Sequence, residues 1–369
     1  MSTATAAAPV LPERRATDDL VFSAWSAVSP FGRGSEAYGS GLRQGVSALS
    51  DVDQGTWPGP YAQAATVPDF SAAEALGKKG TRTMDRVTAL AVSTVGQLLE
   101  ACGPDLAEPP ERTGLVLGTG SGSVQSIMDF TRDSLTGGKP YHVDPARFPN
   151  TVMNRATGQS AIWHGIKGPN TTIAGGWLTG LLALSYAARL FRGGHCDRVL
   201  CGAAEEYSVQ RAWLEWHSAD DTARTPLGEG GTAWLLETAE SARAAGRAPL
   251  ARLRATRFRT YHSPDEASAA LTRCVRDALA DAGVSASDVG FVAPLGTPGE
   301  EDAVRTALGT EPARWLRVRP LLGDTSAAAT GFQTTAVLAA HEGGLSSGTA
   351  ALITGIDRDG TVGCAVLSG

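Results

Sequence analysis

Residues 168–184 read GPNTTIAGGWLTGLLAL, and this stretch decides the fold class of the chain. The pattern predicts a strand that turns sharply into a buried helix, because the glycines at 175, 176 and 180 let backbone segments approach closely. The N–H groups in the first turn of such a helix have no partner within it and can stabilise a developing oxyanion. Enzymes display nucleophiles on elbows of this kind. Here Trp177 occupies the elbow, and an indole cannot attack an acyl carbonyl.

Composition and charge exclude several classes of protein. The chain has 369 residues, 42% of them hydrophobic, which is ordinary for a globular protein with a substantial core. A net charge of −6 gives no case for nucleic-acid binding. No apolar stretch approaches the roughly 20 residues of a membrane span. The five cysteines lack C-x-x-C spacing, which disfavours a zinc site or a disulfide framework and favours a reducing cytoplasm.

Short apolar runs alternate with Ala- and Leu-rich segments, which is the pattern of an α/β protein. Strands are predicted at 20–28, 114–119, 171–174, 199–203, 232–237, 250–260, 289–293, 350–355 and 361–367. Helices are predicted at 86–102, 178–192, 264–282, 300–308 and 327–342. A further helix follows the strand at 114–119 and ends at about residue 135. A polar connection near 240–249 divides the chain, so we expect a flexible tail at 1–18, an N-terminal half at 19–245 and a C-terminal half at 246–369.

Five fragments in the same order carry a resemblance to the β-ketoacyl synthases. The elbow resembles their nucleophile motif T-A-C-x-S-G, with Trp177 at the Cys and Thr179 at the Ser. The other fragments are MDRVTALA (84–91), GLVLGTGSG (114–122), DRVLCGAAEE (197–206) and LGEGGTAWLLE (227–237). The resemblance implies a thiolase-like fold, a duplicated α/β/α/β/α five-layer sandwich, although the sequence shows no close internal repeat.

The resemblance also locates the positions at which an active ketosynthase carries two histidines for decarboxylation and charge stabilisation. The stretch FVAPLGTP (291–298) replaces the first His motif, and the His position falls between Ala293 and Leu295. We assign it to Leu295. The stretch RPLLGDTSAAATG (319–331) replaces the second motif, with Asp324 at the His and Arg319 at the Lys.

A glycine-rich loop in active ketosynthases supplies an oxyanion N–H and a gating Phe, and residues 357–362, including Arg358 and Gly360, occupy its place here. The Cys, both His and the Phe are therefore all replaced, and catalytic groups that act as a unit are of little use singly. The resemblance implies a pseudoenzyme without catalytic residues, the chain length factor of a type II polyketide synthase. That subunit forms a heterodimer with a catalytic ketosynthase, meets acyl carrier protein through the complex and encloses the polyketide acyl chain.

Two of the replaced positions allow more than one interpretation. Trp177 is interpreted as a plug that fills the vacated acyl pocket, or as an ordinary aromatic core residue. For Asp324 a structural role is favoured, as a buried carboxylate paired with Arg319 or Arg358.

The helix that follows Gly122 is the candidate tunnel wall. In chain length factors, the i, i+3, i+7 face of this helix lines the chamber, and bulky side chains there stop chain growth. The corresponding residues are Gln125, Met128 and Arg132, with Asp129 and Phe130 beside them. The alternative is an ordinary interface helix.

No cofactor or metal site is predicted. The loop GTGSGS (118–123) lacks the third glycine of a dinucleotide-binding turn. Two rival functions remain open at this point. One is an enzyme of atypical mechanism that uses Asp324, or a histidine outside the motifs, for acyl transfer or malonyl decarboxylation. The other is a homodimeric scaffold or regulator that never meets a ketosynthase.

Overall fold

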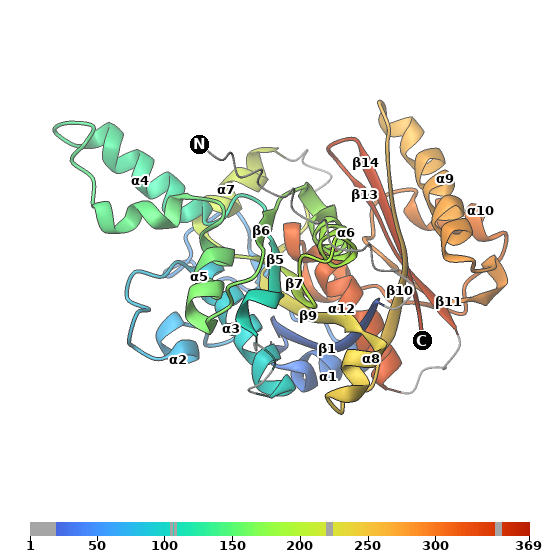
Figure 1. The fold of residues 1–369 in the computed structure, drawn as a ribbon. Helices are drawn as coiled ribbons and strands as arrows, with labels where there is room; N and C mark the ends of the chain where they lie inside the picture. The colour runs from blue at the N-terminus through green and yellow to red at the C-terminus, as the bar shows by residue number, and fades with distance from the viewer. Residues whose placement is uncertain (1–19, 104–105, 107–108, 219–223, 344–348) are drawn as a thin grey trace, which may run out of the picture.

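A mixed β-sheet runs through the centre of the molecule (Figure 1). The computed structural model describes residues 20–103, 106, 109–218, 224–343 and 349–369, so the tail predicted at 1–18 lies outside the described residues. The main strands of the first half are β1 (Leu20–Ser29), β5 (Thr113–Gly118), β6 (Asn170–Ile173), β7 (Arg198–Glu205) and β9 (Gly230–Thr238). Those of the second half are β10 (Ala251–Thr260), β11 (Val289–Pro294), β12 (Arg314–Trp315), β13 (Ala350–Asp357) and β14 (Thr361–Ser368).

The two halves share one strand topology. The spatial order is β6-β5-β7-β9-β1 in the first half and β12-β11-β13-β14-β10 in the second, and antiparallel pairing of β1 with β10 joins them. When the five strands of each half are numbered in chain order, their spatial order in the sheet is third, second, fourth, fifth, first in both halves. In both, the two pairs nearest the third strand are parallel and the other two are antiparallel. This is the duplication that the resemblance implied.

Helices form three layers around the two half-sheets. The outer layers are α3 (Arg86–Cys102) with α5 (Arg155–His164), and α9 (Pro264–Ala282) with α10 (Glu300–Leu308); α6 (Thr179–Arg192) and α12 (Ala329–Glu342) lie between the half-sheets. Successive side chains of each strand point to opposite faces of the sheet. In β5, Leu115 and Leu117 pack with the α3 side, whereas Val116 packs with the α6 side. The five-layer thiolase-like fold is confirmed.

The two central helices cross at a pair of glycines. A Cβ on Gly180 of α6 would lie 2.6 Å from the backbone nitrogen of Gly331 in α12, so only glycine permits this approach. Residues 330–338 of α12 are all buried, as expected for a helix enclosed on all sides. The crossing fixes the start of α6, and Trp177 lies in the turn just before it.

The predicted strands and helices are confirmed, with small shifts at their ends. The helix predicted at 178–192 begins one residue later, because a 3₁₀ turn, η5 (Gly176–Leu178), precedes α6. A matching turn, η7 (Ser326–Ala328), precedes α12. The boundary proposed at 245/246 falls between α8 (Ala239–Ala244) and β10.

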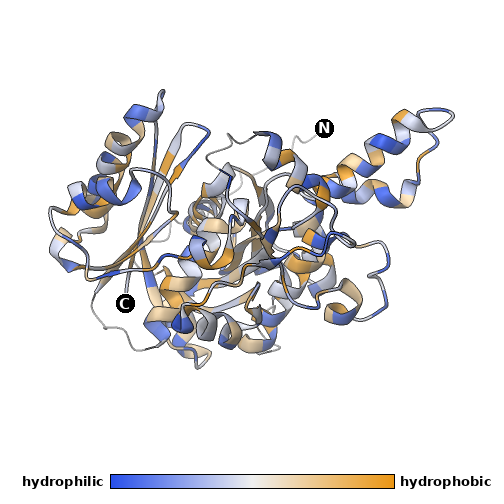
Figure 2. Cartoon of the chain, turned by 180° about the vertical axis from the view of Figure 1, so that it is seen from behind, coloured by the Kyte–Doolittle hydropathy of each residue, from blue (hydrophilic) through white to orange (hydrophobic). Residues whose placement is uncertain are grey.

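Smaller elements surround the sheet. They are β2 (Gly32–Arg33), α1 (Ser35–Gln44), β3 (Ser50–Asp51), β4 (Gln63–Ala65), α2 (Ala72–Leu76), η3 (Pro110–Arg112), α4 (Val124–Thr136), η4 (Pro145–Thr151), α7 (Val209–Ser218), β8 (Leu227–Gly228), η6 (Ala286–Asp288) and α11 (Arg319–Leu322). Apolar residues concentrate in the sheet and the central layer (Figure 2). In the described ranges, no helix combines the length and apolar character that a bilayer span requires. Helix α4 projects from the body beside α7 (Figure 1).

Candidate functional site

The elbow consists of the end of β6, the η5 turn and the start of α6. Gly176 has a φ of +55°, a conformation that side-chain-bearing residues rarely adopt. A Cβ at this position would also collide with the carboxylate of Asp357. The chain therefore needs glycine immediately before Trp177, for both backbone and steric reasons.

Asp357, the last residue of β13, caps the elbow. Its carboxylate accepts a hydrogen bond from the backbone N–H of Trp177 and another, 2.9 Å long, from the N–H of Asp359. Burial raises the pKa of Asp357, and the hydrogen bonds from Asp359 and Trp177 oppose this rise. The sequence predicted free N–H groups at this elbow. That expectation is wrong at Trp177, because a carboxylate, which is attracted to a helix N-terminus, occupies the place of the oxyanion.

The indole of Trp177 is held on its edge and on its ring. Its Nε1–H donates to the Asp324 carboxylate, 3.0 Å from Oδ1 and 3.2 Å from Oδ2. The guanidinium carbons of Arg319 and Arg358 lie 4.9 and 5.3 Å from the ring centroid, in cation–π contact. These contacts join Trp177 to the residues at three of the other replaced positions.

Asp324 is a satisfied structural carboxylate. Arg319 donates to its Oδ2 at 2.7 Å, and the backbone N–H of Ser326 donates to its Oδ1 at 2.8 Å. The predicted pairing with Arg319 is thus confirmed, whereas Arg358 forms its ion pair with Glu215 of α7, at 3.1 Å. Both oxygens of Asp324 are already engaged, which leaves little capacity for general-base chemistry.

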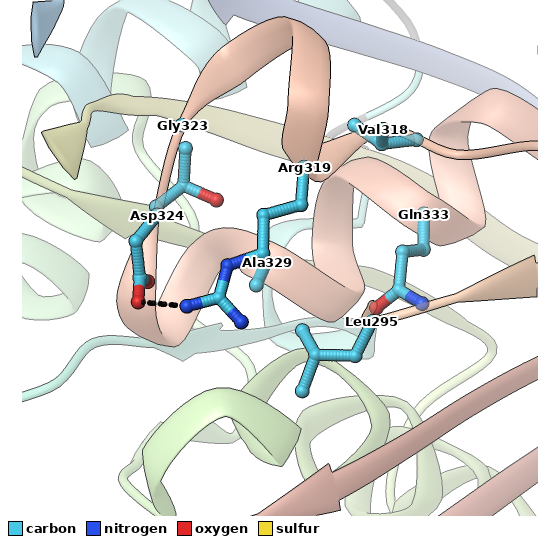
Figure 3. A pocket seen from close by; sticks show the side chains of 8 residues that line it. Leu295, Val318, Arg319, Gly323, Asp324, Ala329 and Gln333 are labelled. Carbon is cyan, nitrogen blue, oxygen red and sulfur yellow. Dashed lines mark hydrogen bonds and ion pairs between the residues drawn. The ribbon is translucent and has the colours of Figure 1, made fainter. Parts of the chain in front are cut away.

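Leu295 and Asp324, the two residues assigned to the lost histidines, line one small cavity (Figure 3). Leu295 is 2% exposed, and its backbone N–H donates to the buried Glu300 at 2.9 Å. The cavity has a volume of about 10 Å³, roughly the space of one water molecule. It is lined by Leu295, Val318, Arg319, Gly323, Asp324, Thr325, Ala329 and Gln333.

The predicted tunnel residues lie on two sides of α4. Gln125, Met128 and Arg132 are exposed, Met128 by 43%. Asp129 is partly buried and accepts hydrogen bonds from Arg132 at 2.9 Å and from Gln210 of α7 at 3.3 Å.

Phe130 lies on another side of the helix. It is partly buried and packs edge-on against Phe148 of η4, with ring centroids 6.0 Å apart. Phe130 therefore belongs to the packing between α4 and η4 rather than to the exposed face.

One side of α4 borders an open cleft of about 570 Å³. Gln125, Ser126 and Asp129 contribute from α4, opposite the start of α3. The remaining lining residues are mostly polar or charged: Arg82, Thr83, Met84, Asp85, Arg86, Ser123, Asp144, Arg147 and Asn150. In the single chain, α4 thus forms one wall of an open cleft.

Comparison with known proteins identifies the family. The family model "Beta-ketoacyl synthase, N-terminal domain" matches residues 18–242, which is more than half of the chain. The chain belongs to the β-ketoacyl synthase family. Its relatives include "3-oxoacyl-(acyl-carrier-protein) synthase 2" of Vibrio harveyi, 26% identical over 81% of this chain and 79% of the relative. The enzyme of the same name from Staphylococcus aureus is also 26% identical, over 81% of this chain and 79% of the relative.

Solved structures of ketosynthases share the fold. A structure described as "The ishigamide ketosynthase/chain length factor" is 41% identical, with a TM-score of 0.85 over 95% of this chain and 100% of that one. A second solved structure is described as a type II polyketide synthase acyl-carrier protein in complex with its ketosynthase (AntDE:AntF). The matching chain of that complex is 18% identical, with a TM-score of 0.79 over 96% of this chain and 100% of that one. The second likeness concerns the fold alone. The first confirms the resemblance to ketosynthases and chain length factors.

Two residues at the elbow of this β-ketoacyl synthase homologue were missed by sequence reasoning. Asp357 was included in the former gate loop without a role, and Glu215 was not considered. An Asp that directly follows an apolar strand and precedes a turn glycine is typical of an Asx turn, so the role of Asp357 in capping N–H groups had a detectable signal. Gly360, with a φ of +85°, forms the turn itself, and its carbonyl accepts from Tyr261 N–H at 2.9 Å.

Several large apolar side chains are exposed on and around α4, α5 and α7 of this ketosynthase homologue. In the described part of the chain, strand β6 pairs only with β5 and ends the sheet. Leu135 of α4 is 80% exposed, and Ile162 of α5 is 76% exposed. Further exposed apolar residues on the same elements and the adjoining segments are Met128, Tyr141, Phe148, Val152, Met153, Trp213 and Leu214. Apolar surface beside an unpaired strand is typical of a protein interface.

Proposed function

We propose that this β-ketoacyl synthase homologue is a catalytically inactive chain length factor. It pairs with an active ketosynthase and shapes the tunnel that holds the growing polyketide chain. The observation that carries the proposal is the filled elbow: Trp177 replaces the nucleophile, and Asp357 occupies its oxyanion N–H. Condensation by an acyl-enzyme route needs both a nucleophile and a donor for the developing negative charge.

The vacated pocket supports the same conclusion. The position of the second histidine carries a carboxylate, Asp324, that is bonded to Trp177 and Arg319. The position of the first histidine carries Leu295, an apolar residue without an acid–base group. The remaining cavity of about 10 Å³ cannot hold an acyl chain. In this proposal Trp177 is the plug of the former acyl pocket.

A tunnel role follows from the position of α4. Its exposed face carries Gln125, Met128 and Arg132, and Asp129 borders the open cleft. A ketosynthase bound along the β6 edge would cover the apolar side chains around it and enclose the cleft. The acyl chain, attached to the partner's nucleophile and supplied by acyl carrier protein, would then extend against α4. The 41% identity to a chain described as part of a ketosynthase/chain length factor supports this pairing.

The two rival functions have less support. An atypical enzyme that uses Asp324 as a base would need a free carboxylate oxygen, whereas both oxygens accept hydrogen bonds. A homodimer could cover the same β6 edge, but it would bring together two filled elbows and no nucleophile. We place the heterodimer in the cytoplasm, because the spacing of the cysteines favours a reducing compartment.

The proposal is tested by co-expression with a ketosynthase from the same gene cluster. We expect a stable heterodimer by size-exclusion chromatography with light scattering, and a poorly soluble or self-associated product when the chain is expressed alone. The isolated chain should release no carbon dioxide from malonyl-loaded acyl carrier protein, whereas the heterodimer should elongate. Decarboxylation by the isolated chain would support the atypical enzyme, and a well-behaved dimer that ignores the ketosynthase would support the scaffold.

A further inference from the structure

Helix α7 has an outward face on which several side chains are exposed. Gln210, Trp213, Leu214 and His217 follow the i, i+3, i+4, i+7 spacing of one helix face. Trp213 and Leu214 on this face are 44% and 46% exposed. Arg211 and Ala212 are the buried residues of the helix. Trp216 packs edge-on against Tyr61 with ring centroids 5.3 Å apart, and the inner face adds polar contacts through Arg211 and Glu215.

Two such contacts lead to the former active site. The guanidinium of Arg211 donates to the backbone carbonyl of Asp324 at 2.9 Å. One helical turn further on, Glu215 forms its ion pair with Arg358. Asp324 and Arg358 are the residues that hold the edge and the ring of Trp177. The inner face of α7 thus contacts two residues that Trp177 also contacts, and the Asp324 carbonyl in addition accepts from Gly228 N–H at 2.9 Å.

The same helix touches the proposed tunnel wall. Helix α7 packs against α4, and Gln210 donates to Asp129, a residue that borders the open cleft. A shift of α7 would therefore move or release a polar contact on α4. Packed elements transmit such shifts because their interfaces are rigid rather than continuously deformable.

We propose that Trp177 is a positioning residue for chain length: it fixes Asp324 and Arg358, these hold α7, and α7 holds the wall that α4 presents to the acyl chain. This inference rests on the proposed function. It differs from the plug role, because it assigns an effect on product length to a residue that need not touch the acyl chain. Loss of the indole should change the product distribution while the partner's chemistry continues.

Hydrogen exchange on the purified heterodimer tests the structural link without catalysis. Local opening governs amide exchange, so Trp177→Ala and Glu215→Gln should each accelerate exchange of the amides at 209–218 by about threefold to tenfold, the effect of losing a contact of modest strength. Arg358→Lys retains the positive charge, so its amide exchange at 209–218 should stay close to that of the unaltered protein. The matched control is Arg317→Gln, which breaks the exposed ion pair with Glu301 far from α7. Exchange at 209–218 that is unchanged in both test variants would overturn the inference.

Product analysis of the same heterodimers tests the functional consequence. We expect Glu215→Gln to shift the distribution of chain lengths without abolishing turnover, and Arg317→Gln to leave it unaltered. If Met128 variants change the product but Glu215→Gln and Trp177→Ala do not, the inference fails while the proposed function stands. If neither group changes the product, the chain-length function itself fails, and exchange at 209–218 still decides the structural link. Glu215 is on the surface side of the network, so its variant keeps the test valid even if Trp177→Ala does not fold.

Discussion

The backbone N–H of Trp177 donates a hydrogen bond to the carboxylate of Asp357, which lies 180 positions further along the chain. In a ketosynthase elbow, that N–H is available to a developing oxyanion. Here an anion is built into the protein at the same place, and the aromatic side chain beside it is fixed by Asp324. The elbow is therefore a closed hydrogen-bonded network in which Trp177 is held by both Asp357 and Asp324.

Restoring a thiol should not restore condensation. Trp177→Cys would place a sulfur at the elbow, but Asp357 would still occupy the N–H, and neither Leu295 nor Asp324 can replace a histidine. We expect no turnover above background when the isolated variant is incubated with acyl- and malonyl-loaded carrier protein. The catalytic partner subunit, assayed in the same way, is the positive control. Product formation by the isolated Trp177→Cys chain would contradict the pseudoenzyme interpretation.

The size of residue 128 should set product length in the heterodimer. Met128 is a flexible apolar residue on the exposed face of α4. Met128→Trp should narrow the chamber and shorten the product, and Met128→Ala should lengthen it or broaden the distribution. Mass spectrometry of the released chains measures both effects. Val46→Ala, an exposed apolar truncation just after α1, is the control, and identical profiles for all three intact complexes would remove α4 from the tunnel.

Breaking the Arg319–Asp324 pair should destabilise the fold. Asp324 is only 13% exposed, and Arg319 is its counter-charge at 2.7 Å. Arg319→Leu leaves that carboxylate poorly compensated, and we expect a loss of about 2–3 kcal/mol in the free energy of unfolding. Arg317→Leu breaks a more exposed ion pair of similar geometry and should cost at most about 1 kcal/mol. Urea denaturation compares the two variants. Equal losses of stability would show that the Arg319–Asp324 pair stabilises the fold no more than an exposed ion pair does.

Stability should fall as the pH rises, because of Glu206. Its carboxylate accepts from Val87 N–H at 3.3 Å and from Gln125 N–H at 3.3 Å, at the start of α3 and of α4. Burial, reinforced by the nearby Asp85, raises the pKa of Glu206 from 4.5 to about 8. A raised folded-state pKa means that the contribution to stability is complete below the unfolded value and is lost as the pH rises through the folded value.

Glu206→Gln removes that titration. Between pH 5 and 8, where the unfolded carboxylate is ionised and the folded one resists ionisation, the unaltered protein should lose stability relative to the variant. Urea midpoints at the two pH values measure the difference. Glu240→Gln changes an exposed glutamate and should follow the unaltered protein. A parallel pH dependence in all three proteins would show that Glu206 is already ionised in the folded state.

The sequence also predicts which catalytic groups are replaced, because each motif lies within a few consecutive residues. Trp177, Asp324 and the loop at 357–362 were assigned in this way, and the structure brings Trp177, Asp324 and Arg358 together. The pairing of Asp324 with Arg319 was predictable because the two are five residues apart. The ion pair of Arg358 with Glu215 was not, because 143 residues separate its partners.

The order of strands and helices was determined by the sequence alone, because alternation and glycine punctuation are local properties of the chain. The replacement of the nucleophile by Trp177 was equally visible. Only the tertiary structure decided what the replacement does. Asp357 reaches the elbow because β13 ends beside η5, and the duplicated strand order of the two halves appears only once the strands pair. Such contacts depend on long-range packing, which no short window of sequence contains.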